Sequence, residues 1–390
     1  MTPLRGLGLR VYLPTFLFFV GDGAVLPVIA LAARDLGASA ALAGLAVALR
    51  SLGVLAFDLP AGWIIARFGE RLAVAWATVG FAITLVGWMV TGSFAVFALL
   101  AFVHGSGWSV WQLARMDYVS STVPADLRGR ALSLLGGVAR VGLFAGPFAG
   151  AALTAAFGFD AVYALALALS IVAAALLFRF SSAHEGRAGV KRPASLRRIA
   201  TTHADALKLT GTAALAIQAL RAARLAIVPL WAQHIGLSAV TTSILFGVTL
   251  GVEVVCVYPG GSMMDRWGRK AVTVPALVLM SLGLALLPLT HDAWAMAAVG
   301  VVLGLGNGIS SGVNMTLGAD LAPAEGRAEF LGIWRVFGDV GTAGGPLVVA
   351  AVTASFALGG ASIVVAALGL AAAGFVSVMV PETDPRRRVG

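Results

Sequence analysis

The sequence contains few charged residues. Asp, Glu, Lys and Arg make up 12% of the 390 residues, roughly half of the share of about 25% that is usual in soluble domains. Hydrophobic residues make up 59%, and the mean hydropathy is +0.94. This composition leaves too little polar surface for a soluble enzyme or a soluble binding module. It favours a chain that lies almost entirely in a membrane.

Cysteine and the residue clusters of common enzyme sites are also scarce. The single cysteine, Cys256, excludes an intramolecular disulfide and is interpreted as a small buried apolar side chain. The sequence has no metal-ligand cluster, nucleotide-binding glycine loop or nucleophile triad. The glycine pairs at 105/107 and 304/306 lie within apolar runs, so we interpret them as packing glycines. The sequence therefore predicts no enzymatic activity, no cofactor and no metal.

Long apolar runs are abundant instead. A bilayer core about 30 Å thick is crossed by a helix of roughly 20 apolar residues, and the sequence has twelve runs of about this length. We therefore predict an all-α membrane protein with twelve transmembrane helices. The predicted spans are 11–33, 41–64, 72–92, 96–118, 130–154, 159–180, 210–232, 240–263, 271–289, 293–317, 329–354 and 360–380.

The distribution of Lys and Arg predicts the orientation of these spans. An even number of spans places both termini on one side, and the loops on the other side contain only one basic residue, Arg34. By the positive-inside rule, both termini are cytoplasmic, in an inner or plasma membrane. The net charge of +9 reflects this topology, so we expect no nucleic-acid binding. The first run is too long for the apolar part of a secretion signal, so we expect it to remain as a helix.

Residues of the first half recur in the second half at a spacing of 199. The matched pairs include Pro60 and Pro259, Gly62 and Gly261, Arg67 and Arg266, Gly69 and Gly268, Gly105 and Gly304, Gly146 and Gly345, and Pro147 and Pro346. One constant offset indicates an internal repeat. Six spans per repeat make the halves parallel, related by an axis along the membrane normal. We predict an N-terminal six-helix bundle at 1–180, a cytoplasmic basic linker with a short surface helix at 181–207, and a C-terminal six-helix bundle at 208–390.

Two loops at this spacing carry the same signature, a small residue, apolar positions, basic residues and a glycine. Its residues are Gly62, Arg67, Gly69 and Arg71 between spans two and three, and Gly261, Asp265, Arg266, Gly268, Arg269 and Lys270 between spans eight and nine. They resemble the loop signature of the major facilitator superfamily, in which a glycine turn joins two helices and the charges pair with helix ends and neighbouring charges. The resemblance covers essentially the whole chain. It implies two six-helix bundles that rock about a central site by alternating access.

The first-half loop departs from the family pattern. Ala66 stands where Asp265 stands in the second half, and Ser121 stands where Asp320 stands. The resemblance therefore implies a weaker charge cluster in the first half and a better-formed one in the second. Asp117 and Asp58 are the candidate replacements.

Span five carries a glycine–proline pattern together with an arginine. The residues are Arg140, Gly142, Gly146, Pro147 and Gly150. It resembles the motif of family members that export substrate in exchange for protons, the drug:proton antiporter branch. Plain helix packing is the alternative, because span eleven has the same glycines and proline. The arginine that the branch carries in span four is replaced by Ala101, which opposes proton-coupled export.

Ionisable residues within the spans are costly unless they are paired, so each is a functional hypothesis. Asp22 in span one and Arg221 in span seven are equivalent at the offset of 199. In the family these spans line the transport cavity, so we predict that Asp22 carries the proton and that Arg221 is its partner or a substrate contact. Arg224, one turn further, adds positive charge.

Two further charge pairs are predicted between the halves. Arg140 and Glu253 lie at similar depth in spans that the family packs together, and the same reasoning pairs Asp58 with Arg335, flanked by Asp339 and Arg50. Structural or gating roles and proton transfer both remain open for them. The proton-coupling candidates are Asp22, Glu253, Asp339 and Asp58.

Polar residues at helical spacing in spans four and ten suit a pocket for an amphipathic organic molecule. With the charged residues of spans one and seven, the substrate-cavity candidates are Asp22, His104, Trp108, Gln112, Arg115, Arg221, Arg224, Asn307 and Asn314. The alternatives are that Trp108 and Trp111 face lipid, and that the asparagines only join helices by hydrogen bonds.

Taken together, these features predict a secondary transporter without an ATP site. Proton-coupled export of a small organic or drug-like molecule is the first hypothesis. An uptake carrier for an anionic metabolite is the second, favoured by Arg115, Arg221 and Arg224. A lipid flippase and a non-transporting membrane sensor are further alternatives. The expected partners are a small-molecule substrate, protons and the lipid bilayer, with no obligate protein partner.

Overall fold

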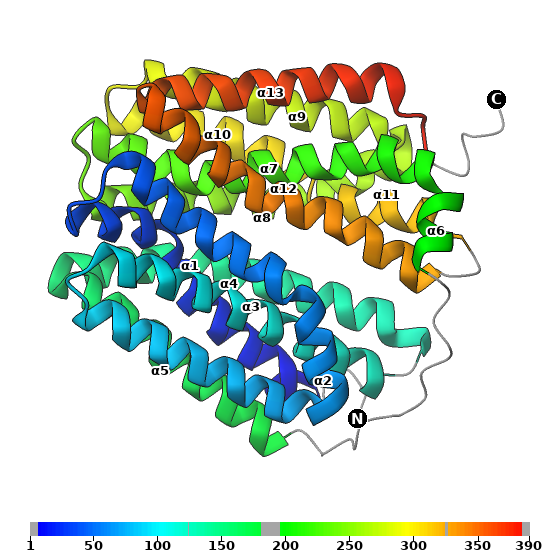
Figure 1. The fold of residues 1–390 in the computed structure, drawn as a ribbon, viewed down its shortest axis with the longest axis horizontal. Coiled ribbons are helices and arrows are strands. Elements are labelled where there is room, and N and C mark those ends of the chain that lie inside the picture. The colour runs from blue at the N-terminus through cyan, green and yellow to red at the C-terminus, as the bar shows by residue number, and fades with distance from the viewer. Residues whose placement is uncertain (1–6, 124, 181–195, 324–326, 384–390) are drawn as a thin grey trace. The chain divides into compact units, whose positions relative to one another are not determined.

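The computed structural model describes residues 7–123, 125–180, 196–323 and 327–383. All regular structure among these residues is helical (Figure 1). Twelve segments of the described chain are long and apolar enough to cross a membrane. The predicted all-α fold with twelve transmembrane helices is therefore confirmed, and the chain is a multi-pass membrane protein.

The spans correspond to the helices almost one to one, with two exceptions. Spans two and three form the single long element α2, and span ten is divided into α10 and α11. The elements are η2 (Gly8–Tyr12), α1 (Leu13–Asp35), α2 (Ala40–Val90), α3 (Phe94–Thr122), α4 (Ala125–Phe157), α5 (Phe159–Phe180), α6 (Leu196–Thr202), α7 (Ala204–His234), α8 (Ala239–Trp267), α9 (Lys270–Leu286), η3 (Leu287–Leu289), α10 (Ala293–Ile309), α11 (Val313–Leu321), α12 (Arg327–Ser355) and α13 (Leu358–Met379).

Glycines form the sharp turns between helices in both halves. Gly37 ends the α1 turn with φ 82°, and Gly236, 199 residues later, ends the α7 turn with φ 81°. Gly69 has φ 79° at the bend inside α2, and Gly268 has φ 96° between α8 and α9. Side chains with a Cβ rarely adopt this backbone conformation. The glycine turn predicted for both signature loops is thus present.

The chain divides into two compact units. One comprises Met1–Gly189 with Ser238–Gly247, and the other comprises Val190–Leu237 with Val248–Gly390. In the predicted linker, α6 is the expected short helix, whereas residues 181–195 lie outside the described part of the chain. The exact bundle boundaries stay predictions.

Glycines of span five pack against span one. A Cβ added at Gly146 would overlap the carbonyl oxygen of Val20. The repeat-equivalent Gly345 on α12 stands in the same way against Ala219 on α7. Close helix packing therefore accounts for the span-five glycines in both halves. The motif alone no longer distinguishes an exporter.

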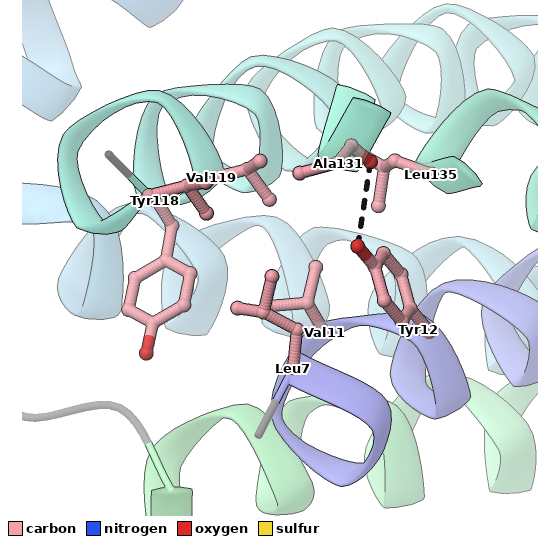
Figure 2. Packing of buried hydrophobic residues seen from close by; sticks show 8 residues of the cluster. Leu7, Val11, Tyr12, Tyr118, Val119, Ala131 and Leu135 are labelled. Atoms are coloured by element: carbon pink, nitrogen blue, oxygen red, sulfur yellow. Dashed lines mark hydrogen bonds between the residues drawn. The ribbon is translucent and has the colours of Figure 1, made fainter. Parts of the chain in front are cut away.

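The N-terminal turn is fixed to the ends of α3 and α4 in the first unit. Leu7, Val11 and Tyr12 are buried in an apolar cluster with α3 and α4 residues that include Val119 and Leu135 (Figure 2). The Tyr12 hydroxyl donates to a backbone carbonyl oxygen of α4 at 3.5 Å. These contacts hold the beginning of α1, the helix that carries Asp22.

Candidate functional site

A buried ion pair joins α1 and α2 in the first unit. Arg50 Nη2 lies 2.7 Å from Asp22 Oδ1, and the two side chains are 11% and 5% exposed. Arg50 Nε also donates to His104 Nδ1 on α3 at 3.3 Å. The predicted place of Arg50 beside Asp58 and Arg335 involves both units and stays a prediction. The charge of Arg50 is compensated by Asp22.

An aromatic cluster fixes the imidazole of His104. Its ring stacks on Trp88 with centroids 5.3 Å apart and meets the edge of Phe81 at 5.0 Å. Because Nδ1 accepts from the always-charged Arg50, this nitrogen carries no proton and the ring is neutral. His104 therefore acts as a hydrogen-bond acceptor, and its place in a substrate cavity stays a prediction.

A second buried ion pair joins α7 and α8 in the second unit. Arg224 Nη1 contacts Glu253 Oε1, and the side chains are 6% and 13% exposed. Glu253 Oε2 accepts from Asn307 Nδ2 on α10 at 2.5 Å. Both carboxylate oxygens are thus engaged within the unit. The predicted pairing of Glu253 with Arg140 on α4 would join the two units and stays a prediction.

The two ion pairs join equivalent helices, but the positions of the acid and the base are reversed. The acid lies on the first helix in one unit, at Asp22, and on the second helix in the other unit, at Glu253. The site also repeats at 203 rather than 199 residues, from Arg50 to Glu253 and from His104 to Asn307. The difference is about one helical turn. Sequence comparison at 199 therefore paired Asp22 with Arg221 and missed both ion pairs.

A glycine beside each hydrogen-bonding partner brings the helices together. Gly105 follows His104, and an added Cβ there would overlap the carbonyl oxygen of Arg50. Gly308 follows Asn307, and an added Cβ there would meet the carbonyl oxygen of Glu253. Only glycine permits this approach, which sets the distance between the side chains of each site.

Arg221 is held by neutral groups next to the second ion pair. Its Nη1 donates to Gln218 Oε1 at 2.9 Å, and its Nη2 donates to Ser310 Oγ at 2.8 Å and to the carbonyl oxygen of Asn307 at 3.4 Å. Span ten breaks between α10 and α11, immediately after Asn307 and Ser310. The break frees the Asn307 carbonyl from the helical ladder. Irregular backbone of this kind often lines transport sites.

Other predicted residues lie apart from these sites. Asp58 accepts from Ser109 on α3, and Arg335 pairs with Asp339 one turn along α12 at 3.5 Å. The pairing of Asp58 with Arg335 would join the two units and stays a prediction. The Asn314 carbonyl accepts from Trp334 at 3.2 Å, which ties α11 to α12.

The polar side chains of α3 pack against α1. Trp111 is 0% exposed and stacks on Phe18 with centroids 3.9 Å apart. The alternative that Trp111 faces lipid is therefore wrong. Trp108 meets the edge of Phe19 at 6.4 Å. Gln112 accepts from Arg115, whose guanidinium lies over the Phe19 ring at 4.9 Å.

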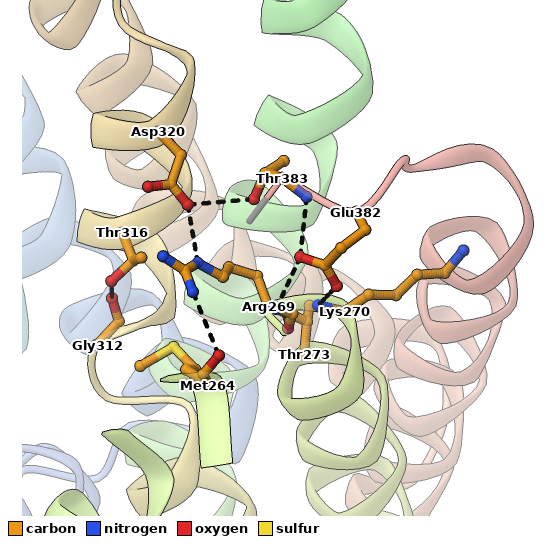
Figure 3. A network of polar contacts seen from close by, with 9 residues as sticks. All are labelled: Met264, Arg269, Lys270, Thr273, Gly312, Thr316, Asp320, Glu382 and Thr383. Atoms are coloured by element: carbon orange, nitrogen blue, oxygen red, sulfur yellow. Dashed lines mark hydrogen bonds and ion pairs between the residues drawn. The ribbon is translucent and has the colours of Figure 1, made fainter. Parts of the chain in front are cut away.

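The second-half loop forms a charge network (Figure 3). Arg269 Nε lies 2.8 Å from Asp320 Oδ2. Glu382, after the last span, accepts from the backbone N–H of Arg269 at 2.9 Å and of Lys270 at 3.1 Å. A carboxylate at these free N–H groups caps the N-terminus of α9 and suits the positive end of the helix dipole. Glu382 was not identified from the sequence. The only signal in the sequence was that an acidic residue follows directly after span twelve.

Within the described part of the chain, Arg71 of the first-half loop is held by a backbone carbonyl and an aromatic ring. Arg71 donates to the carbonyl oxygen of Phe178 on α5 and lies over that ring at 5.6 Å. Neither candidate replacement acid, Asp58 or Asp117, forms an ion pair with Arg71 in the described structure. Arg67 is exposed. The side chain of Ser121 lies outside the described residues.

Comparisons with known proteins identify the family of this chain and solved structures with a similar fold. The model of the Major Facilitator Superfamily matches residues 11–224 and 209–390. A POT family transporter in complex with a thioalcohol-conjugated peptide has a TM-score of 0.77 at 12% identity, covering 96% of each chain. A nucleoside transporter has a TM-score of 0.76 at 14% identity, covering 96% of this chain and all of its own. A D-xylose-proton symporter has a TM-score of 0.74 at 16% identity, covering 96% of this chain and 98% of its own. No curated protein matches the sequence significantly.

Proposed function

Because the chain belongs to the major facilitator superfamily and is a secondary transporter, we propose that it moves a small organic molecule across the membrane in a cycle coupled to protons. The buried pair of Asp22 and Arg50 carries this proposal. The Asp22 carboxylate, within span one, neutralises the buried guanidinium of Arg50. Protonation of Asp22 would remove that neutralisation.

The free energy involved is large enough to drive a conformational change. Breaking a buried ion pair by removing the charge of one partner costs about 3–5 kcal/mol, because the other charge stays buried and unpaired. A tenfold change in an equilibrium constant needs only about 1.4 kcal/mol. The loss of the Asp22 charge therefore supplies enough free energy to shift the equilibrium between two arrangements of the bundle.

Glu253 is the corresponding acid of the second unit. Its carboxylate neutralises Arg224 and is oriented by Asn307. We propose Glu253 as the second proton-coupling residue, and Arg221, held only a turn away on α7, as the substrate contact. Asp339 pairs along its own helix, so we assign it a structural role.

Export in exchange for protons is one candidate direction, but the span-five glycines that suggested it are accounted for by helix packing and give it no further support. Uptake together with protons is the second candidate, favoured by similarity to a D-xylose-proton symporter. The uptake of an anionic metabolite loses some of its support, because Glu253 already neutralises Arg224. A flippase or a sensor gains no support from either ion pair.

Transport in proteoliposomes tests the proposal. A thermal-shift panel of sugars, nucleosides, peptides, organic acids and drug-like compounds first identifies a substrate. In vesicles of uniform orientation with an internal pH dye, an imposed proton gradient then reports coupling and direction. Asp22→Asn is expected to abolish gradient-driven transport while substrate exchange without a gradient persists. Asp35→Asn, at the exposed end of the same helix, is the matched control. Undiminished gradient-driven transport by Asp22→Asn would refute its role.

A further inference from the structure

His104 on α3 is the second acceptor of the Arg50 guanidinium. Arg50 Nη2 lies 2.7 Å from Asp22 Oδ1 on α1, and Arg50 Nε donates to His104 Nδ1 at 3.3 Å. His104 is 3% exposed, so little solvent reaches this contact. Arg50 is therefore held from two sides, by a charged acceptor on α1 and by a neutral acceptor on α3.

Glycines produce two closely packed pairs of helices around this site. On α1, a Cβ added at Gly23 would overlap the carbonyl oxygen of Leu143 on α4. On α2, a Cβ added at Gly53 would overlap the carbonyl oxygen of Phe102 on α3. Backbones that approach so closely pack as one body. The first unit thus contains an α1–α4 pair and an α2–α3 pair.

The ion pair joins these two pairs of helices. Asp22 belongs to the α1–α4 pair, whereas Arg50 and His104 both belong to the α2–α3 pair. The stacking of Phe18 on Trp111 also connects α1 to α3, but it contains no charge that protonation would change. The contact of Arg50 with His104 therefore lies within one closely packed pair, and the contact of Arg50 with Asp22 crosses between the two.

A neutral Asp22 would change the balance between these contacts. An ionised carboxylate forms a charge-assisted hydrogen bond with a guanidinium, which is stronger than a hydrogen bond to a neutral carboxyl group. The contact of Arg50 with His104 does not depend on the charge of Asp22. Because an unsatisfied buried donor is costly, Arg50 should keep this contact while its interaction with α1 weakens.

The second unit supports a role for His104 as an acceptor. The residue 203 positions later is Asn307, which donates from Nδ2 to Glu253 on α8. In each unit this position contacts the charge on the second helix, a base at Arg50 and an acid at Glu253. The contacting atom accepts from the base in one unit and donates to the acid in the other. The comparison therefore indicates that hydrogen bonding, and not titration of the imidazole, is what position 104 provides.

Further titratable or charged side chains lie within about two helical turns of this site, along the helices that contact it. They are Asp58 on α2, Arg140 on α4, and Asp160 and Tyr163 on α5. None of them is among the hydrogen-bond or ion-pair partners of Asp22, Arg50 or His104 in the described structure. Asp22 is therefore the group through which a proton would change the charge of this site.

We propose that His104 is a positioning residue of the proton-coupling site and holds Arg50 on the α2–α3 pair when Asp22 is protonated. Proton binding then weakens the contact between α1 and α2 and leaves the contact of Arg50 with His104 intact. The movement that the proton permits is a movement of α1 and α4 relative to α2 and α3. This inference rests on the proposed role of Asp22 in proton coupling.

Two substitutions of His104 separate hydrogen bonding from packing. His104→Phe keeps an aromatic ring against Phe81 and Trp88 but removes the acceptor. His104→Asn removes the ring, but its amide oxygen can accept in place of Nδ1 and the amide does not titrate. Ser106→Ala on the same helix is the matched control, because the Ser106 hydroxyl donates to backbone carbonyls of Gly53 and Phe102.

The measured quantity is the ratio of gradient-driven transport to exchange without a gradient, in proteoliposomes with a substrate from the thermal-shift panel. His104→Phe is expected to lower this ratio about tenfold, the factor that corresponds to the loss of one hydrogen bond from a charged donor. His104→Asn and Ser106→Ala are expected to keep it close to that of the unsubstituted protein. A pure packing role of His104 would give the opposite order, because Asn disturbs the ring contacts more than Phe does.

The outcomes separate this inference from the proposed function. Undiminished gradient-driven transport by Asp22→Asn refutes the role of Asp22 and with it this inference. If Asp22→Asn abolishes that transport but His104→Phe keeps the ratio of the unsubstituted protein, only the positioning role of His104 is wrong. An equal loss in His104→Asn and His104→Phe overturns the acceptor role, because the imidazole itself would then have to bind a proton.

A structure provides the test if His104→Phe fails to fold. In a cryo-EM structure of Asp22→Asn, Arg50 within hydrogen-bond distance of His104 supports the proposal. Arg50 turned away from His104 in that structure refutes it.

Discussion

The coupling between Asp22 and Arg50 is open to direct measurement by a double-mutant cycle. Arg50→Met keeps the length of the side chain and removes its charge, which leaves the Asp22 carboxylate buried at 5% exposure. Asp22→Asn leaves Arg50 buried with His104 as its remaining acceptor at 3.3 Å. Each single change creates one unpaired buried charge and is expected to cost about 3–5 kcal/mol.

The double variant removes both charges at once. Replacing a buried ion pair by neutral side chains of similar volume is often close to neutral in stability. We therefore expect the double variant to be more stable than either single variant, with a coupling energy of about 3 kcal/mol or more. Equilibrium unfolding in mixed detergent micelles, with retained helix content as the check on folding, provides the four stabilities. Additive effects of the two substitutions would refute the ion pair as an energetic unit.

Two further outcomes follow from individual contacts. Glu382→Gln removes the charged cap of α9 and is expected to lower the unfolding free energy by about 1 kcal/mol, whereas equal stability in an unfolding titration would show that the cap contributes nothing. Gly345→Leu should prevent folding or strongly destabilise the second unit, because its Cβ would overlap the Ala219 carbonyl. Gly344→Leu, next to it with open space around the Cβ, should fold with little loss in the same assay.

The fold was predictable because the same sequence feature, an apolar run long enough to cross the membrane, recurs along the whole chain. Twelve apolar runs each have the length of the bilayer core, and the glycines at 37, 69, 236 and 268 stand where the backbone requires a positive φ. The division of span ten was not predicted. The predicted span 293–317 ran through the polar and small residues Ser310, Ser311 and Gly312 because the flanking segments are apolar. In the structure the hydroxyls of Ser310 and Ser311 both donate to the Asn307 carbonyl oxygen at this interruption.

The ion pairs were less accessible from the sequence. Their partners lie on different helices, so no local spacing joins Asp22 to Arg50 or Arg224 to Glu253. The predicted depth of each charged residue in the membrane allowed several possible partners for it. The choice depends on a shift of one turn between the halves and on the close approach at Gly105 and Gly308. These are properties of helix packing that a single sequence does not express.

The placement of each ion pair within one unit constrains how protons could drive transport. A pair that joined the two halves would break whenever they rock apart, whereas a pair internal to one half is preserved by rigid-body rocking. The proposed protonation of Asp22 would therefore have to act by changing the packing of α1, α2 and α3, which Arg50 and His104 hold together. Because the charges are exchanged between equivalent helices, the backbone repeat by itself does not produce these pairs. What the two halves share is a buried ion pair between their first two helices, hydrogen-bonded to a residue that precedes a packing glycine.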